Sequence, residues 1–146
     1  MLQKLRVLIL CTGNSARSQM AEGFWRRLGG DRWEVFSAGV DPKGVNPVAV
    51  QVMAEAGVDI SAQRSKNVTE FHGQPFDLVV TVCDNAAAAC PSFPGAKCRV
   101  HWPFEDPPHR PVADEAQLSA WRRVRDRIRT RISEYLRQQQ GAGEGE

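Results

Sequence analysis

The chain has 146 residues, of which 25% are charged and 42% hydrophobic, and its formal net charge is +2. This composition is typical of one soluble globular domain, and the length is enough to bury a substantial core. The small net charge gives no general attraction to nucleic acid, and the longest apolar stretch is too short to cross a bilayer. No signal-peptide pattern precedes the first apolar run, so we expect a cytoplasmic protein that binds neither nucleic acid nor membrane.

The first expected elements are a buried strand, an amphipathic helix and a second strand. The continuous apolar run at residues 7–10 predicts a strand that is covered on both faces. Apolar residues recur at helical spacing within residues 19–28 and predict a helix. The apolar face of this helix comprises Met20, Phe24 and Leu28. The alternating, β-prone residues 33–37 predict the second strand.

A second helix is expected to begin at Asn46-Pro47, because proline is favoured in the first turn of a helix, and to end at Gly57. Its apolar face comprises Val48, Val52, Met53 and Ala56. The polar residues 61–76 are expected to be irregular apart from one helical turn near residues 69–71.

The remaining elements are two short strands, at residues 78–82 and 98–102, and a long final helix over residues 113–136. The apolar stripe of that helix comprises Leu118, Trp121, Val124, Ile128, Ile132, Tyr135 and Leu136, with Arg125 on the same face. Residues 138–146 are rich in Gln, Gly and Glu and are expected to fray, which leaves a domain of residues 1–137.

Alternating strands and helices predict an α/β fold: a single-domain, open, parallel four-stranded sheet with helices on both faces. Ligands of such sheets bind at the carboxyl ends of the strands. Cys11, Cys83 and Asp106 each follow an expected strand, so we expect these three residues to meet at that edge of the sheet.

Eight residues after the first expected strand have the composition of an anion-binding loop. They are Cys11, Thr12, Gly13, Asn14, Ser15, Ala16, Arg17 and Ser18. A short glycine-containing loop before a helix directs successive backbone N–H groups into one hollow. Arg17 can close this hollow with donors that match a tetrahedral oxyanion. Cys11 is expected to be a thiolate there, the alternative being a small buried hydrophobic residue.

Two further residues of the loop have expected roles. Asn14 tolerates left-handed backbone angles and is expected to shape the loop. Ser18 can donate a hydrogen bond to the Cys11 thiolate or cap the helix, and both roles are compatible with the sequence.

The spacing Cys-x5-Arg-Ser after an N-terminal strand resembles the low-molecular-weight protein tyrosine phosphatases and the arsenate reductases of that fold. The segment from Cys11 to Gly23 resembles the reductase branch, and the resemblance covers roughly residues 5–136. The later motifs that carry it are Ser37-Ala38-Gly39, Gly44-Val45-Asn46-Pro47, Asp59-Ile60-Ser61, Asp77 to Cys83, Cys90-Pro91, His101-Trp102 and Asp106-Pro107.

This resemblance implies an arsenate reductase that binds arsenate in the loop of residues 12–18. In such an enzyme the Cys11 thiolate attacks arsenic and Asp106 protonates the departing oxygen, with the adjacent Glu105 as the alternative proton donor. The resemblance also implies a thiol relay, in which Cys83 attacks Cys11 and Cys90 then takes over the disulfide. We expect no bound cofactor but an external thiol reductant, which is thioredoxin or, as in some relatives, glutaredoxin.

The spacing of Cys83 and Cys90 restricts how such a relay can work. Seven residues separate Cys83 from Cys90, a rise of about 10.5 Å in a helix, whereas a disulfide needs Cα atoms within about 7 Å. Pairing therefore requires a conformational change. The fourth cysteine, Cys98, is expected to be structural, and no Cys or His spacing indicates a metal site.

Some relatives bind potassium through residues that correspond to Asn14, Glu22, Ser37 and an acidic residue at position 66. Here position 66 is a lysine, which puts this metal site in doubt. The ammonium group of Lys66 can stand where the ion would lie, and the alternative is an ordinary exposed lysine.

Two other functions compete with arsenate reduction. A low-molecular-weight phosphatase needs only Cys11, Arg17 and Asp106. However, family phosphatases carry tyrosine beside the Asp-Pro pair, whereas residues 101–112 here contain none. A non-catalytic oxyanion or arsenic sensor, which uses the cysteines only for binding, is the second competitor.

Overall fold

The computed structural model of the chain describes residues 4–82, 95–108 and 114–144, with residues 140–144 described in their backbone only. The strands are β1 (Leu5–Cys11), β2 (Trp33–Gly39), β3 (Leu78–Thr81) and β4 (Arg99–His101). The α-helices are α1 (Arg17–Gly29), α2 (Pro47–Glu55) and α4 (Glu115–Glu144). Two short 3-10 helices are η1 (Gly30–Arg32) and η2 (Val68–Phe71).

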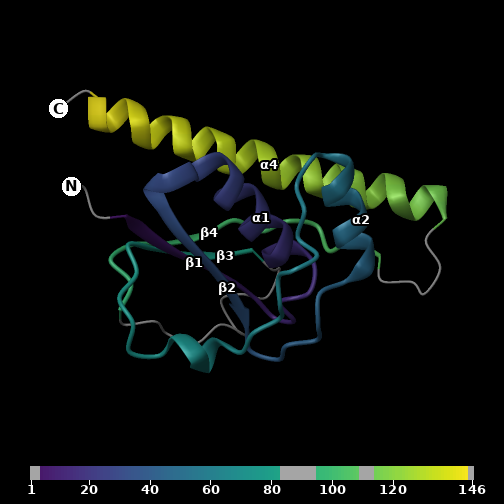
Figure 1. Cartoon of the computed structure of the whole chain (residues 1–146), viewed down its shortest axis with the longest axis horizontal. Coiled ribbons are helices and arrows are strands. Elements are labelled where there is room, and N and C mark those ends of the chain that lie inside the picture. Colours follow the sequence, from purple (N-terminus) through teal and green to yellow (C-terminus); the bar gives the residue numbers. More distant parts are fainter. Residues whose placement is uncertain (1–3, 83–94, 109–113, 145–146) are drawn as a thin grey trace.

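The four strands form one parallel sheet in the order β2-β1-β3-β4 (Figure 1). In the register of this sheet, Cys11 at the end of β1 lies opposite Gly39 at the end of β2. Thr81 at the end of β3 pairs with Leu10 on one side and with His101 on the other. The predicted α/β fold with a parallel four-stranded sheet is therefore confirmed, and the carboxyl ends of all four strands lie at one edge.

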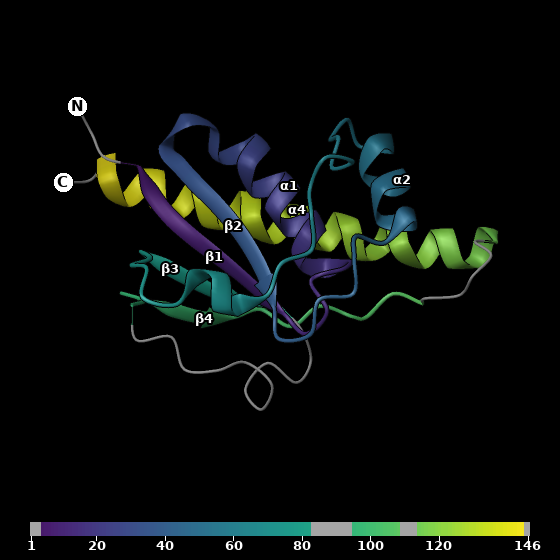
Figure 2. The ribbon, with the colours of Figure 1, turned by 60° about the horizontal axis from the view of Figure 1, so that its bottom comes forward.

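Helices cover both faces of the sheet, but unequally. The helices α1 and α4 pack against each other on one face (Figure 2). There Trp25 of α1 stacks on Trp102 with ring centroids 5.9 Å apart. On the other face the 3-10 helix η2 brings Phe71 against Phe36 and Phe76, with centroid distances of 5.6 and 6.1 Å. The two aromatic clusters enclose the apolar strands in a layered core.

Three details of the helices differ from the sequence prediction. In α1, Leu28 is 40% exposed, and the fully buried Trp25 fills the space beside Trp33. The helix α4 continues to Glu144 rather than ending near Leu136; Arg137 and the three glutamines after it are good helix formers, whereas Gly141 and Gly143 are poor ones. The short helix η1, between α1 and β2, is an element that the sequence pattern did not predict.

The start of α2 and the turn near residue 70 follow the prediction. Asn46 caps α2 with a side-chain oxygen that accepts a hydrogen bond from the Val48 amide at 2.8 Å, and Pro47 occupies the first turn. The helical turn expected at residues 69–71 is η2, which Asn67 caps in the same way through the Thr69 amide.

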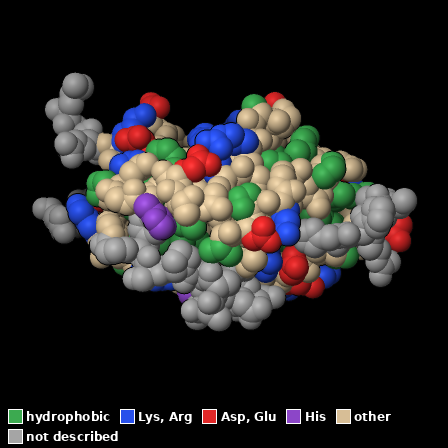
Figure 3. Space-filling view, turned by 90° about the horizontal axis from the view of Figure 1, so that it is seen from below, with side chains coloured by type: hydrophobic (Ala, Val, Ile, Leu, Met, Phe, Trp, Pro, Cys, Tyr) green, Lys and Arg blue, Asp and Glu red, His purple; other side chains and the backbone are tan. Residues whose placement is uncertain are grey.

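Within the part of the chain that the structure describes, no helix combines the length and the apolar character needed to cross a membrane. On the face seen in Figure 3, hydrophobic side chains are scattered among polar atoms, and acidic and basic side chains lie next to one another.

The register of β1 and β2 makes Gly39 a sensitive position. A Cβ atom there would lie 2.5 Å from the Thr12 carbonyl oxygen and 2.9 Å from the Asn14 amide nitrogen. Since both are backbone atoms, Gly39→Ala must displace the loop after β1, and we expect it to lower the free energy of unfolding by about 1–3 kcal/mol. Urea denaturation measures this change.

Gly13→Ala is the matched control for Gly39→Ala. The nearest atom to a Cβ at Gly13 is Cγ of the flexible Lys43 side chain, at 3.2 Å, which can move aside. We expect the smaller loss of stability there, and equal losses in the two variants would contradict the close approach at Gly39.

Candidate active site

The candidate site is the loop that joins β1 to α1 at the carboxyl edge of the sheet. Cys11, the last residue of β1, is 4% exposed, and Arg17 begins α1. Neighbouring amides bind the loop's carbonyl oxygens from outside: Asp41 N to Thr12 O at 3.0 Å, Lys43 N to Gly13 O at 2.9 Å, and Asn46 N to Ser15 O at 3.0 Å. These hydrogen bonds engage three carbonyl groups that would otherwise be able to repel a bound anion.

Asn14 fixes the shape of this loop from within. Its φ of 46° lies in the left-handed region, and its side chain is fully buried. The Nδ2 group donates to Ser18 Oγ at 2.8 Å and to Ser37 Oγ at 2.9 Å. The Oδ1 atom accepts from Gln19 Nε2 at 2.9 Å and from the Lys66 amide at 2.8 Å. Asn14 thus ties the loop to α1, to β2 and to the segment before η2.

Ser18 is fully buried and lies inside the first turn of α1. The N-cap of the helix is Ala16, and no side chain caps it, so the prediction that Ser18 is the cap is wrong. Its hydroxyl oxygen accepts the hydrogen bond from Asn14, which leaves the hydroxyl proton for a second partner. Donation from Ser18 to the Cys11 thiolate stays a prediction.

Arg17 connects the loop to the segment that carries Asp106. The guanidinium donates from Nη1 to the Phe104 carbonyl at 3.0 Å, and Nη2 lies 3.5 Å from Asp106 Oδ1. Arg17 has a side chain that is 10% exposed, whereas that of Asp106 is 49% exposed. The carboxylate of Asp106 therefore stands at the mouth of the site, in reach of both the guanidinium and water.

Glu105, the alternative proton donor, is directed to α4 instead. Arg123 donates to both of its carboxylate oxygens at 3.1 Å, and Arg127 lies 3.9 Å away. The bonded Arg123 guanidinium holds the pKa of the Glu105 carboxyl below its ordinary value, which favours the charged form. The geometry thus brings Asp106, and not Glu105, to Arg17.

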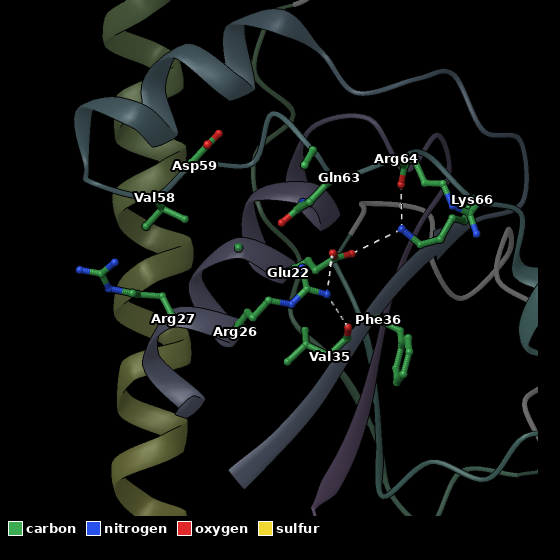
Figure 4. Close-up of a pocket in the computed structure, with 12 residues that line it drawn as sticks. Glu22, Arg26, Arg27, Val35, Phe36, Val58, Asp59, Gln63, Arg64 and Lys66 are labelled. Carbon is green, nitrogen blue, oxygen red and sulfur yellow. Dashed lines mark hydrogen bonds and ion pairs between the residues drawn. The ribbon is translucent and has the colours of Figure 1, made fainter. Parts of the chain in front are cut away.

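A charged cluster of the buried Glu22 and Lys66 and the exposed Arg26 lies next to the loop, and Figure 4 shows Glu22 between the other two. Glu22 accepts from Ser37 Oγ at 2.5 Å, Arg26 lies 3.0 Å from Oε2, and Lys66 Nζ lies 3.5 Å from Oε1. Lys66 Nζ also donates to the Arg64 carbonyl at 2.7 Å.

Lys66 is 8% exposed, so the alternative of an ordinary exposed lysine is wrong. Burial lowers the pKa of Lys66, while the neighbouring charge of Glu22 opposes this effect. The pocket beside the cluster, of about 550 Å³, is lined by Glu22, Arg26, Lys66 and their neighbours, and by none of residues 11–18. Among the described residues, no group of three or more His, Cys, Asp or Glu side chains could hold a metal ion.

The sequence analysis missed Gln19, which is fully buried beside the loop. Its Nε2 group donates to the Asn14 carbonyl and to the Arg64 carbonyl, both at 3.0 Å. The sequence signal that could have indicated this role is that Gln19, a long polar residue, directly precedes Met20 of the apolar face of α1.

Cys83 and Cys90 lie outside the described residues. Cys98 is exposed, so it is not a buried packing residue.

The fold and the loop define an α/β protein with a cysteine and an arginine in the loop that the sequence predicts to bind an oxyanion. The family model for low molecular weight phosphotyrosine protein phosphatase matches residues 6–142, and the chain belongs to this family.

Relatives over nearly the whole length are arsenate reductases. One from Halalkalibacterium halodurans is 48% identical over 92% of this chain and 96% of that protein. A solved arsenate reductase in its phosphate-binding state has a TM-score of 0.78 and 32% identity, over 92% of this chain and 98% of that one. A thioredoxin-dependent arsenate reductase from Corynebacterium glutamicum has a TM-score of 0.74 and 28% identity, over 95% of this chain and 63% of that one.

The hydrogen bonds of Asn14 predict a large effect of its removal. Asn14→Ala deletes four buried side-chain hydrogen bonds and places alanine at a positive φ, so we expect the free energy of unfolding to fall by roughly 2–4 kcal/mol in chemical denaturation. Asn67→Ala, which removes the capping hydrogen bond of η2, is the control and should cost about 1 kcal/mol. Equal losses would mean that Asn14 does not organise the loop.

Proposed function

We propose that this protein reduces arsenate to arsenite, with Cys11 as the nucleophile. The observation that carries the proposal is the placement of Cys11 at the base of an anion loop whose arginine also contacts Asp106. Relatives that match almost the entire chain, and that are named arsenate reductases, support the choice of arsenate as substrate.

In the first step arsenate binds against the N–H groups of residues 12–18 and the Arg17 guanidinium. The Cys11 thiolate attacks arsenic and forms an S–As bond, while one As–O bond breaks. Asp106 gives its proton to the departing As–OH group of hydrogen arsenate, which leaves as water, because an unprotonated oxygen is a poor leaving group. Ser18 donates a hydrogen bond that stabilises the thiolate before attack, and Asn14 holds Ser18 in place.

In the second step the Cys83 thiolate attacks the sulfur of Cys11. A Cys11–Cys83 disulfide forms, and the electron pair of the S–As bond passes to arsenic, which leaves as arsenite. Cys90 then attacks Cys83, so that the disulfide moves to Cys83–Cys90 and Cys11 is released as a thiolate. The two electrons that arsenic gains therefore come from two cysteine thiols.

An external dithiol must reduce the final disulfide to complete the cycle. Thioredoxin is the proposed partner, supported by the thioredoxin-dependent reductase among the structural relatives, and glutaredoxin is the alternative. Such a cycle requires a reducing compartment, so we place the protein in the cytoplasm. No bound cofactor is needed.

A weak phosphatase activity is a second candidate, because the same loop can bind a phosphoryl group. The family match and a relative solved in its phosphate-binding state favour it. The only tyrosine of the chain, Tyr135, packs against Trp25 and Trp102, at centroid distances of 5.6 and 5.4 Å, and does not belong to the segment beside Asp106. The segment beside Asp106 therefore lacks the tyrosine that family phosphatases carry there, which argues against phosphotyrosine as the main substrate.

The test of the proposal is arsenate-dependent NADPH oxidation with thioredoxin and its reductase, run beside a glutaredoxin mixture. We expect turnover by the unmodified protein and none by Cys11→Ser, because a hydroxyl is scarcely ionised at neutral pH. Arg17→Lys should also fail, since one ammonium cannot reproduce two-point oxyanion binding. Stoichiometric arsenic capture without turnover would favour the sensor, and substantial turnover by Cys11→Ser would refute the nucleophile.

The relay predicts different trapped species in two cysteine variants. Cys83→Ser should stall with arsenic bound to Cys11, whereas Cys90→Ser should release one arsenite and accumulate a Cys11–Cys83 disulfide. Mass mapping of peptides after a single arsenate turnover distinguishes these species. Multiple turnovers with thioredoxin in both variants would exclude the relay.

The ammonium group of Lys66, in this proposal, occupies the place that potassium takes in some relatives, and its contact with Glu22 supports this role. Replacing potassium by a large inert cation at constant ionic strength should then hardly change the apparent arsenate affinity. Lys66→Asp should create a potassium requirement, because alkali ions prefer oxygen ligands. Strong potassium activation of the unmodified protein, unchanged in Lys66→Asp, would make Lys66 a bystander.

A further inference from the structure

Asp106 lies on a connecting segment, residues 102–108, that follows β4 and has no regular secondary structure. Backbone hydrogen bonds hold the beginning of this segment, from Trp102 N to Thr81 O at 2.8 Å and from Phe104 N to Val82 O at 3.2 Å. Asp106 itself comes after these contacts and is half exposed. Its distance from Arg17 must therefore also depend on what holds the other end of the segment.

Helix α4 holds that other end through the Pro108 carbonyl. This oxygen accepts a hydrogen bond from Gln117 Nε2 at 2.9 Å and one from Trp121 Nε1 at 2.8 Å. The two donors are four residues apart and lie on the same face of α4. Gln117 is 3% exposed and Trp121 is fully buried, so water cannot easily replace either hydrogen bond.

The sequence between Asp106 and this anchor is stiff. Pro107 and Pro108 both have a fixed φ, and the residue before a proline is itself restricted to extended conformations. The hydrogen bonds at the Pro108 carbonyl therefore also restrict the position of Asp106, because few rotatable bonds lie between the two residues.

The ion pair between Glu105 and Arg123 also joins this segment to α4, but it is the weaker contact. The two side chains are 44% and 47% exposed, and exposed ion pairs contribute little net stability. The two buried hydrogen bonds to the Pro108 carbonyl cost more to break than this ion pair, because the carbonyl oxygen would then be buried without a hydrogen-bond partner.

We infer that Gln117 and Trp121 are positioning residues for Asp106, so that helix α4 sets where the proposed proton donor stands relative to Arg17. This inference rests on the proposed function, in which Asp106 protonates the departing oxygen. It assigns a role in the chemistry to two side chains of the C-terminal helix that are remote in sequence from the anion loop.

The variants that test this inference are Gln117→Met, which nearly keeps the side-chain volume but lacks the donor, and Trp121→Phe, which loses the indole N–H. Trp25→Phe is the matched control. Trp25 is likewise fully buried and in contact with α4 through Tyr135, but its indole N–H has no hydrogen-bond partner among the described residues. Because Trp25 also stacks on Trp102 at the start of the segment, this control separates a loss of aromatic packing from the loss of a hydrogen bond to Pro108.

Each variant is measured as kcat/KM for arsenate, at a temperature where circular dichroism shows it to be folded. We expect Gln117→Met and Trp121→Phe each to lower kcat/KM roughly threefold to tenfold, and the double variant to approach the loss seen in Asp106→Asn, on the order of 100-fold. The inhibition constant for phosphate should stay unchanged, because the loop itself is intact. Trp25→Phe should leave kcat/KM unchanged.

The decisive comparison repeats the two substitutions in an Asp106→Asn background. If Gln117 and Trp121 act through Asp106, they should cause no further loss there, whereas a general structural role would lower kcat/KM again. An additive loss in that background, or an equal loss in Trp25→Phe, would overturn the inference alone. Full activity in Asp106→Asn would overturn both the inference and the assignment of Asp106 as proton donor, and would leave arsenate attack by Cys11 standing. No arsenate turnover by the unmodified protein would overturn the proposed function and this inference with it.

Discussion

The buried side chain of Asn14 is the contact on which the rest of the candidate site depends. Through four hydrogen bonds it joins a left-handed loop residue to α1, to β2 and to the segment that carries Lys66. Because these partners come from positions as far apart as 18 and 66, the loop acquires its shape only when the surrounding elements have packed. The loop is then preorganised, so the oxyanion proposed to bind there does not have to reorganise it.

The sheet and the helix α4 supply the second part of the site. Parallel register brings the end of β1 beside the end of β2, where only a glycine fits opposite Cys11. The strand β4 leads into the segment with Asp106, and α4 meets that segment at Glu105 and Pro108. The proposed nucleophile, Cys11, and the proposed proton donor, Asp106, thus come from segments far apart in the sequence, which the parallel sheet brings to one edge.

Local patterns sufficed for much of this organisation. The apolar run before Cys11, the Asn-Pro start of α2 and the Cys-x5-Arg spacing each depend on neighbouring residues, and sequence periodicity could predict them. The burial of Lys66 and Gln19 could not be predicted in this way, because it depends on contacts between residues about 45 positions apart. The choice between Asp106 and Glu105 likewise needed the position of Arg123 on α4.

The ammonium group beside Glu22 has one consequence that follows from its covalent attachment. The occupancy of a site by a dissolved ion depends on the concentration of that ion. The ammonium group of Lys66 is covalently attached, so in the folded chain it is always present beside Glu22 at the same effective concentration. In the role proposed for Lys66, the loop that Asn14 organises is therefore independent of the potassium concentration of its surroundings. The same covalent attachment means that the loop cannot be regulated by exchanging one bound cation for another.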